Sequence, residues 1–133
     1  MDEMDEYSQS TQSSAGVDAP ALRLAALVVT CNRLAQLRPT LSRLLAEPVD
    51  HHRVFDNGSD DGTADWLAAQ DDPRLLVVRS EQNLGGAGGF ARAMEQARDR
   101  LRPDWMLLMD DDARPEPGAL AAFRAIEAAG QLT

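Results

Sequence analysis

The 133-residue sequence has a single cysteine, Cys31, and lacks both a long hydrophobic run and a basic signal segment. One thiol cannot form a disulfide within the chain, so a reducing compartment is the simplest expectation. The longest apolar run, Leu24 to Val29, is far below the roughly 20 residues needed to span a bilayer. Acids stand at the N-terminus, where a signal peptide has bases. The sequence therefore predicts a cytoplasmic protein with at most peripheral association at the inner face of the membrane.

A basic stripe is also missing. All thirteen bases are arginines, and they are scattered among acids after residue 20. A protein that binds the phosphate backbone of nucleic acid needs its bases gathered on one face, so nucleic acid is not an expected partner. Residues 1–20 carry five acids and no base beside a polar Ser/Gln/Thr run, which predicts a disordered acidic leader. Without this leader the formal net charge changes from −9 to −4.

Residues 21–133 contain short apolar runs that alternate with longer segments of helical spacing. That alternation, in a chain with 44% hydrophobic residues, predicts one α/β domain. The predicted strands are residues 22–30, 51–55, 75–78 and 105–109. The predicted helices are residues 34–45, with the regular part starting near Pro39, then 64–68, 90–101, and a last helix from Pro115 or Pro117 to Ala129.

Four strands joined by helical crossovers predict a Rossmann-like, mostly parallel sheet with helices on both faces. In such sheets ligands bind outside the carboxyl ends of the strands, near the point where the strand order reverses. The polar clusters that fall at this edge are Thr30 with Cys31, Asp56, the loop 80–89, and the triplet Asp110–Asp112. This edge is therefore the candidate functional site.

Three consecutive carboxylates, Asp110, Asp111 and Asp112, follow the fourth predicted strand. They repel one another, and a divalent cation would resolve the conflict. In an extended segment Asp110 and Asp112 would point to the same side. Mg²⁺ and Mn²⁺ suit such a site, because they are typically held by one or two carboxylates plus substrate phosphates. The alternative is a solvated turn that starts at Asp112.

Two other clusters each allow two interpretations. Asp56 with Asn57 can be an ordinary Asx turn, or a carboxylate that faces the crevice and accepts from a base or a ribose. An EF-hand comparison fails, because Gly58 and Leu67 stand where calcium ligands belong. Residues 86–91 match G-x-G-x-x-A, but a polar stretch separates them from the preceding strand, so a dinucleotide fingerprint is rejected. These glycines form either a flexible loop or a backbone cradle for an anion.

The remaining unusual side chains are assigned no chemistry. His51 and His52 lie away from the candidate edge and are expected to be surface residues. Cys31 has no nearby histidine to activate its thiol, so it is expected to be a small residue at a strand end. Trp66 and Trp105 are expected in the core or at its border.

Four segments together resemble the inverting family 2 glycosyltransferases of the GT-A fold. They are V-V-T-C-N-R at 28–33, D-N-G-S-D-D-G-T at 56–63, N-L-G-G-A-G-G-F at 83–90 and M-D-D-D-A at 109–113. The glycine segment followed by D-D-D resembles the bacterial galactofuranosyltransferase branch in particular. The resemblance covers residues 23–129. It implies transfer of galactofuranose or a related sugar from a UDP donor to a cell-wall or lipid-linked glycan.

The resemblance also implies roles for residues at the candidate edge, carried over by position. Thr30 and Asp56 would hold the uracil. Asn83, Gly85 and Gly86 would lie near the ribose and the sugar of the donor.

Asp110 and Asp112 would, by the same resemblance, form the D-x-D pair that binds Mn²⁺ or Mg²⁺ and the donor diphosphate, whereas Asp111 has no implied role. The general base of these enzymes comes from an acidic motif well downstream, so it is expected beyond Thr133. Residues 21–133 would then be the nucleotide-sugar-binding domain, incomplete at the C-terminus. The alternative function is a non-catalytic, truncated nucleotide-binding module.

Overall fold

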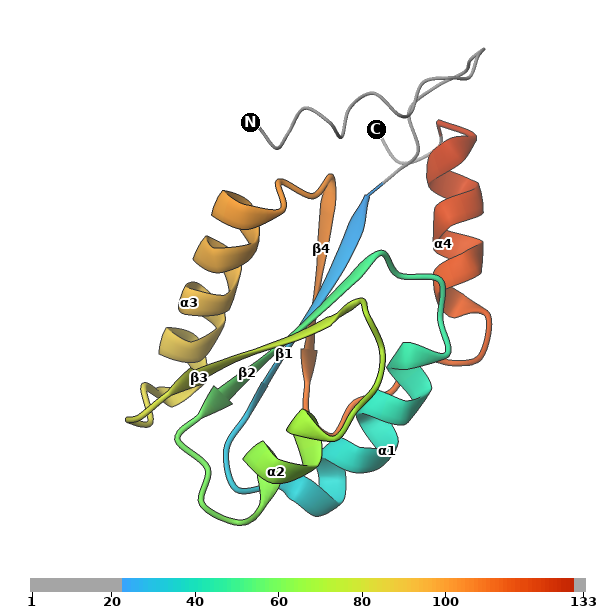
Figure 1. Ribbon diagram of the computed structural model, residues 1–133. Helices are drawn as coiled ribbons and strands as arrows, with labels where there is room; N and C mark the ends of the chain where they lie inside the picture. Colours follow the sequence, from blue (N-terminus) through green and yellow to red (C-terminus); the bar gives the residue numbers. More distant parts are fainter. Residues whose placement is uncertain (1–22, 131–133) are drawn as a thin grey trace.

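The computed structural model describes residues 23–130 as a parallel sheet with helices packed against it (Figure 1). The predicted leader 1–20 and Leu22, the expected start of the first strand, lie outside the described residues. None of the helices within the described range is long and apolar enough to cross a membrane.

The sheet has four strands, which are β1 (Leu24–Thr30), β2 (His51–Asn57), β3 (Leu75–Ser80) and β4 (Trp105–Asp110). All neighbouring strands are parallel, and their order is β3-β2-β1-β4. This confirms the predicted parallel sheet. Strands β2 and β3 are each two residues longer than expected, because Asp56 pairs with Arg79 and Asn57 pairs with Ser80 across them. Asp56 is therefore a residue within β2 and not at its tip.

The four helices are α1 (Leu34–Leu45), α2 (Thr63–Ala68), α3 (Gly85–Arg100) and α4 (Ala119–Ala128). Figure 1 shows α3 on one side of the sheet and α1, α2 and α4 on the other, which confirms the prediction of helices on both faces. Two buried clusters agree with this arrangement. Helices α1, α2 and α4 cover residues such as Val28 and Val54, and α3 covers Leu27 and Phe55.

The strand order places a topological reversal at the centre of the sheet. From β1 the chain adds β2 and β3 on one side, and it then returns to add β4 on the other side of β1. Ligands of open α/β sheets bind where the order reverses in this way. The segments that follow β1 and β4 are therefore the best placed to form a binding site.

Helix α1 begins at Leu34, so the expected start of the regular helix near Pro39 is wrong. Pro39 removes one backbone donor from the helix interior. The apolar face of the helix compensates for this loss, because Leu37, Leu41 and Leu44 are fully buried against the sheet.

The interpretation of His52 as a surface residue is also wrong. Its side chain is fully buried in β2, and both ring nitrogens lack a hydrogen-bond partner among the described residues. Burial, reinforced by the nearby positive charge of Arg74, lowers the pKa of His52 from 6.5 to about 4. The imidazole is therefore neutral at physiological pH. Its neighbour His51 is half-buried.

The expected position at the border of the core is confirmed for Trp66 but is wrong for Trp105, which is 38% exposed at the start of the edge strand β4. Trp66 packs at the border of the larger core cluster. Trp105 meets Phe123 of α4 edge to face, with ring centroids 5.4 Å apart, which helps to hold α4 against the sheet.

Helix α3 lies close to the sheet because Gly89 has no side chain. A Cβ atom at this position would lie 2.7 Å from Cγ1 of Val29 and 3.2 Å from Nδ2 of Asn57. Gly86 lies in the first turn of the same helix, and a Cβ atom added there would have no neighbouring atom within 4 Å. The two glycines therefore form a matched pair with opposite expected responses to alanine.

We expect Gly89→Ala to lower the free energy of unfolding by about 1–3 kcal/mol, because the methyl group forces the helix away from β1 and β2. We expect Gly86→Ala to leave it unchanged or to raise it by up to about 1 kcal/mol, because alanine favours helix. Urea denaturation of both variants measures the difference. Equal stabilities for the two would contradict the close packing described.

Candidate functional site

The acidic triplet lies at the end of β4 and turns back toward β1. The strand ends at Asp110, and Asp111 and Asp112 form a turn, so the expected extended geometry for the pair Asp110 and Asp112 is wrong. Asp111 is buried and accepts a hydrogen bond of 2.9 Å from the Thr30 hydroxyl. This contact joins the carboxyl ends of β1 and β4, where the strand order reverses.

Arg33 supplies the positive charge at this turn. Its Nε donates to Asp111 at 2.9 Å, and its Nη2 donates to Asp112 at 3.1 Å. The hydrogen bond to Asp111 is the main reason why the pKa of Arg33 is raised. The carboxylate of Asp110 is exposed and accepts no hydrogen bond from the described part of the chain.

Neither Arg33 nor Asp111 was expected to matter. Repulsion within the triplet called for a counter-charge, and Arg33 is the first arginine after the first strand. The sequence therefore indicated that a positive charge is needed near the triplet. Only the parallel pairing of β1 with β4 shows that Arg33 is the arginine that supplies it.

The acidic turn offers oxygen donors of the kind that a divalent cation binds. Its donors are carboxylate oxygens, which Mg²⁺ and Mn²⁺ prefer, and the guanidinium of Arg33 already occupies a cationic position between Asp111 and Asp112. Within residues 23–130 no three His, Cys, Asp or Glu side chains form a group that could hold a metal ion. A cation here would therefore need phosphate or water oxygens to complete its coordination.

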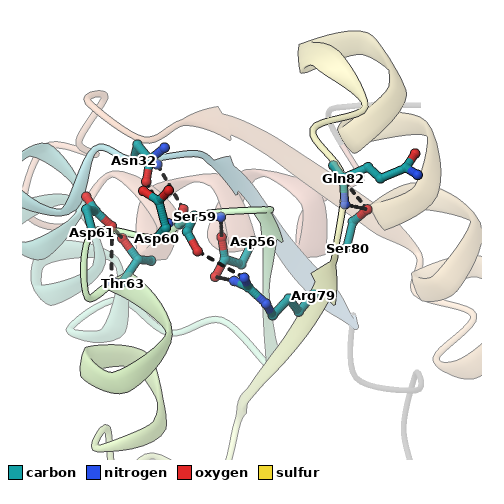
Figure 2. A network of polar contacts seen from close by, with 9 residues as sticks. All are labelled: Asn32, Asp56, Ser59, Asp60, Asp61, Thr63, Arg79, Ser80 and Gln82. Atoms are coloured by element: carbon teal, nitrogen blue, oxygen red, sulfur yellow. Dashed lines mark hydrogen bonds and ion pairs between the residues drawn. The ribbon is translucent and has the colours of Figure 1, made fainter.

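Asp56 anchors the loop that follows β2. Its side chain is fully buried, with Oδ1 accepting from the Ser59 backbone N–H at 3.0 Å and Oδ2 accepting from Arg79 at 2.7 Å. Arg79 also donates to the Ser59 carbonyl at 2.9 Å, and Figure 2 shows the three residues as one closed network. Both oxygens of this carboxylate are engaged inside the fold, and its contact with a base or a ribose stays a prediction.

The same loop is tied to the start of α1. The backbone N–H of Asn32 donates to Ser59 Oγ, and Asn32 Oδ1 accepts from the Asp60 N–H, both at 2.8 Å. Asp61 accepts from the Thr63 hydroxyl at 2.5 Å (Figure 2), which is the main reason why the pKa of Asp61 is lowered. The loops after β1 and β2 are therefore joined by hydrogen bonds and form one wall of the site.

The glycine segment is not the loop that was expected up to residue 89. Helix α3 already begins at Gly85, because buried Asn57 accepts from the Leu84 N–H at 2.8 Å and donates to the Gly85 carbonyl at 3.0 Å. Gly86 lies in the first turn, where backbone N–H groups have no partner within the helix. This turn can offer those donors to an anion.

Asn83 connects the glycine segment with the end of β1. Its Oδ1 accepts from the Gly85 N–H at 2.8 Å, and its Nδ2 lies 3.5 Å from Sγ of Cys31. Burial, followed by the nearby Asp56, raises the pKa of the Cys31 thiol. A thiol held in its neutral form is a poor nucleophile, which agrees with the absence of an expected role for Cys31.

The candidate residues thus fall into three neighbouring groups at one sheet edge. Thr30 lies with the acidic turn, Asp56 is held inside the wall after β2, and Asn83 with Gly85 forms the start of α3.

Comparisons with known proteins agree with this fold. Residues 25–126 match the model of the protein family Glycosyl transferase family 2. Over 94 residues the chain is 38% identical to the galactofuranosyltransferase GlfT1 of Mycolicibacterium smegmatis, an alignment that covers 69% of this chain and 30% of that protein.

Two solved structures share the fold. The mannosyltransferase PcManGT from Pyrobaculum calidifontis, in complex with GDP-Man and Mn²⁺, has a TM-score of 0.62 and 24% identity over 78% of this chain and 32% of its own. TarS 1–349 of S. aureus has a TM-score of 0.66 and 21% identity over 80% of this chain and 33% of its own. These likenesses confirm the expected GT-A fold.

The chain spans about a third of the length of each of these proteins. The family match covers most of the chain and includes all four strands apart from Leu24. The chain belongs to glycosyl transferase family 2.

Proposed function

We propose that the chain is the donor-binding part of an inverting glycosyltransferase. It would transfer galactofuranose or a related sugar from a UDP donor to a cell-wall or lipid-linked glycan, in the cytoplasm or at the inner face of the membrane. The observation that carries the proposal is the acidic turn Asp110–Asp112, bound to Thr30 at the reversal of the strand order. The similarity to GlfT1 supports the choice of sugar.

The acidic turn is proposed to hold the donor diphosphate together with Mn²⁺ or Mg²⁺, through Asp110 and Asp112. A bound cation would act as a Lewis acid that stabilises the charge on the leaving diphosphate. Asp110 is exposed and free to contact the donor. Asp111 keeps the turn in place through its buried contacts with Thr30 and Arg33.

The nucleoside is proposed to bind beside the wall after β2. Thr30 and Asp56 would recognise the uracil, and Asn83, Gly85 and Gly86 would lie along the ribose and sugar. Asp56 is engaged with Arg79, which is 37% exposed. Recognition by Asp56 would therefore require the hydrogen bond from Arg79 to Oδ2 of Asp56 to break when the uracil binds.

Transfer also needs an acceptor hydroxyl that is held in line and deprotonated by a general base. We propose that this base belongs to an acceptor-binding part outside residues 1–133, since the matched part of this chain covers only about a third of these relatives. A non-catalytic nucleotide-binding module is the second candidate. Residues 1–133 alone are expected to form no product, whereas extended product from UDP-galactofuranose and a galactofuranose-terminated acceptor, formed by a longer protein that contains them, would decide for the enzyme.

We expect UDP to bind in the presence of Mn²⁺ and to bind at least about tenfold more weakly in EDTA, because the diphosphate would then face three uncompensated carboxylates. Isothermal titration calorimetry on residues 1–133 measures both affinities. GDP serves as the control for base selectivity, and it should bind more weakly than UDP. Equal UDP affinity with Mn²⁺ and with EDTA would contradict the proposed site.

A further inference from the structure

Arg33 shares the acidic turn with any cation that binds there. It lies in the segment between β1 and α1, and its guanidinium reaches two of the three carboxylates across the reversal of the strand order. Three negative charges are thus balanced by one positive charge from the described chain. The proposed function uses this arginine only to hold Asp111 in the turn.

The two ion pairs of Arg33 differ in their surroundings. The Arg33 side chain is 43% exposed, but Asp111 is only 9% exposed and also accepts from Thr30, so the carboxylate of this pair is largely shielded from water. Asp112 is 56% exposed, and its pair with Arg33 is longer, at 3.1 Å. Exposed ion pairs contribute little to stability, so the contact with Asp112 is the one that can be exchanged.

We propose that Arg33 is the resident counter-ion of the acidic turn, and that a divalent cation displaces it from Asp112 while it stays bound to Asp111. The inference rests on the proposed function, because it assumes that the turn is a cation site. Its consequence is that Arg33 weakens cation binding in the absence of a donor. The anionic diphosphate would offset this effect, so that metal and nucleotide bind together more readily than metal alone.

The test is the affinity for Mn²⁺ alone, without nucleotide, measured by electron paramagnetic resonance of the free ion. We expect Arg33→Gln to bind Mn²⁺ roughly tenfold more tightly than the wild type, because it removes a positive unit charge beside the proposed cation site. Glutamine keeps a donor for Asp111. Arg33→Lys keeps the charge and should bind Mn²⁺ as the wild type does.

Arg100→Gln provides a control with the same change of net charge. It lies at the end of α3 opposite to the site, about 20 Å along the helix from its start. In about 0.15 M salt its charge is screened beyond about 8 Å. It should therefore leave the Mn²⁺ affinity unchanged.

Weaker or unchanged Mn²⁺ binding by Arg33→Gln would overturn the inference, as would an equal change in Arg33→Lys. Melting curves in EDTA establish that each variant is folded. If the wild type binds Mn²⁺ and UDP together but Arg33→Gln gains no affinity for Mn²⁺, this inference fails and the proposed function stands. If neither protein binds Mn²⁺ under any condition, both fail.

Discussion

Replacing both Asp110 and Asp112 by asparagine is expected to weaken Mn²⁺-dependent UDP binding by roughly 100-fold or more, because each lost carboxylate charge is worth about tenfold next to a divalent ion. Asp111 remains in this variant, so the buried contacts with Thr30 and Arg33 are kept. The loss should therefore reflect the cation site and not a collapse of the turn. Calorimetry with UDP in Mn²⁺ measures it.

The same double variant should be as stable as the wild type without metal, or more stable. The carboxylate of Asp110 has no hydrogen-bond partner among the described residues, and the exposed pair of Asp112 contributes little, whereas the repulsion within the triplet is relieved. A variant with Asp71→Asn and Glu95→Gln, two exposed acids elsewhere, controls for net charge. A clearly lower melting temperature in EDTA would show that the triplet is structural.

Acidification from pH 8 to pH 5 is expected to reduce the free energy of unfolding by about 2 kcal/mol through His52 alone. The unfolded chain takes up a proton on this residue with a pKa of 6.5, but the folded chain does so only near 4. The contribution of neutral His52 to the free energy of unfolding is therefore fully present above pH 6.5. It is lost as the pH falls through that value, and the loss ends near pH 4.

The variant His52→Val should lack this part of the pH dependence, since valine suits a buried strand and carries no titratable group. Chemical denaturation at pH 8 and pH 5 gives the difference for each protein. His51→Gln is the matched control, because His51 is only half-buried and its pKa is lowered less. A pH dependence in His52→Val equal to that of the wild type would refute the assignment to this imidazole.

The types and number of secondary-structure elements could be predicted from local pattern. Side chains repeat every two residues along a strand and about every 3.6 residues along a helix, so a short stretch of sequence reveals which of the two it forms. Examples are the apolar run from Leu75 to Val78 and the helical spacing of Leu37, Leu41 and Leu44. All four strands and all four helices are present near the predicted positions. The edge that carries the candidate site followed from the same reasoning, because parallel strands must end on one side.

The glycine segment shows where local pattern was insufficient. Four glycines between residues 85 and 89 predict a loop by propensity, yet these residues form the first turn of α3. Asn57, which is 28 residues away in sequence from Gly85, holds the turn, and the sheet behind Gly89 has no room for a side chain. Both reasons depend on a strand that pattern alone does not place beside the helix.

The partners of the site's charges were settled only by the tertiary structure. Arg33 and Asp111 are 78 residues apart in the chain, and Asp56 and Arg79 are 23 apart. They meet because β4 pairs with β1 and β3 pairs with β2. The order of the strands depends on how the helices cover both faces of the sheet, and these contacts join segments that are far apart in the sequence. Composition and local spacing could identify charged residues at one edge, but they could not show which charge neutralises which.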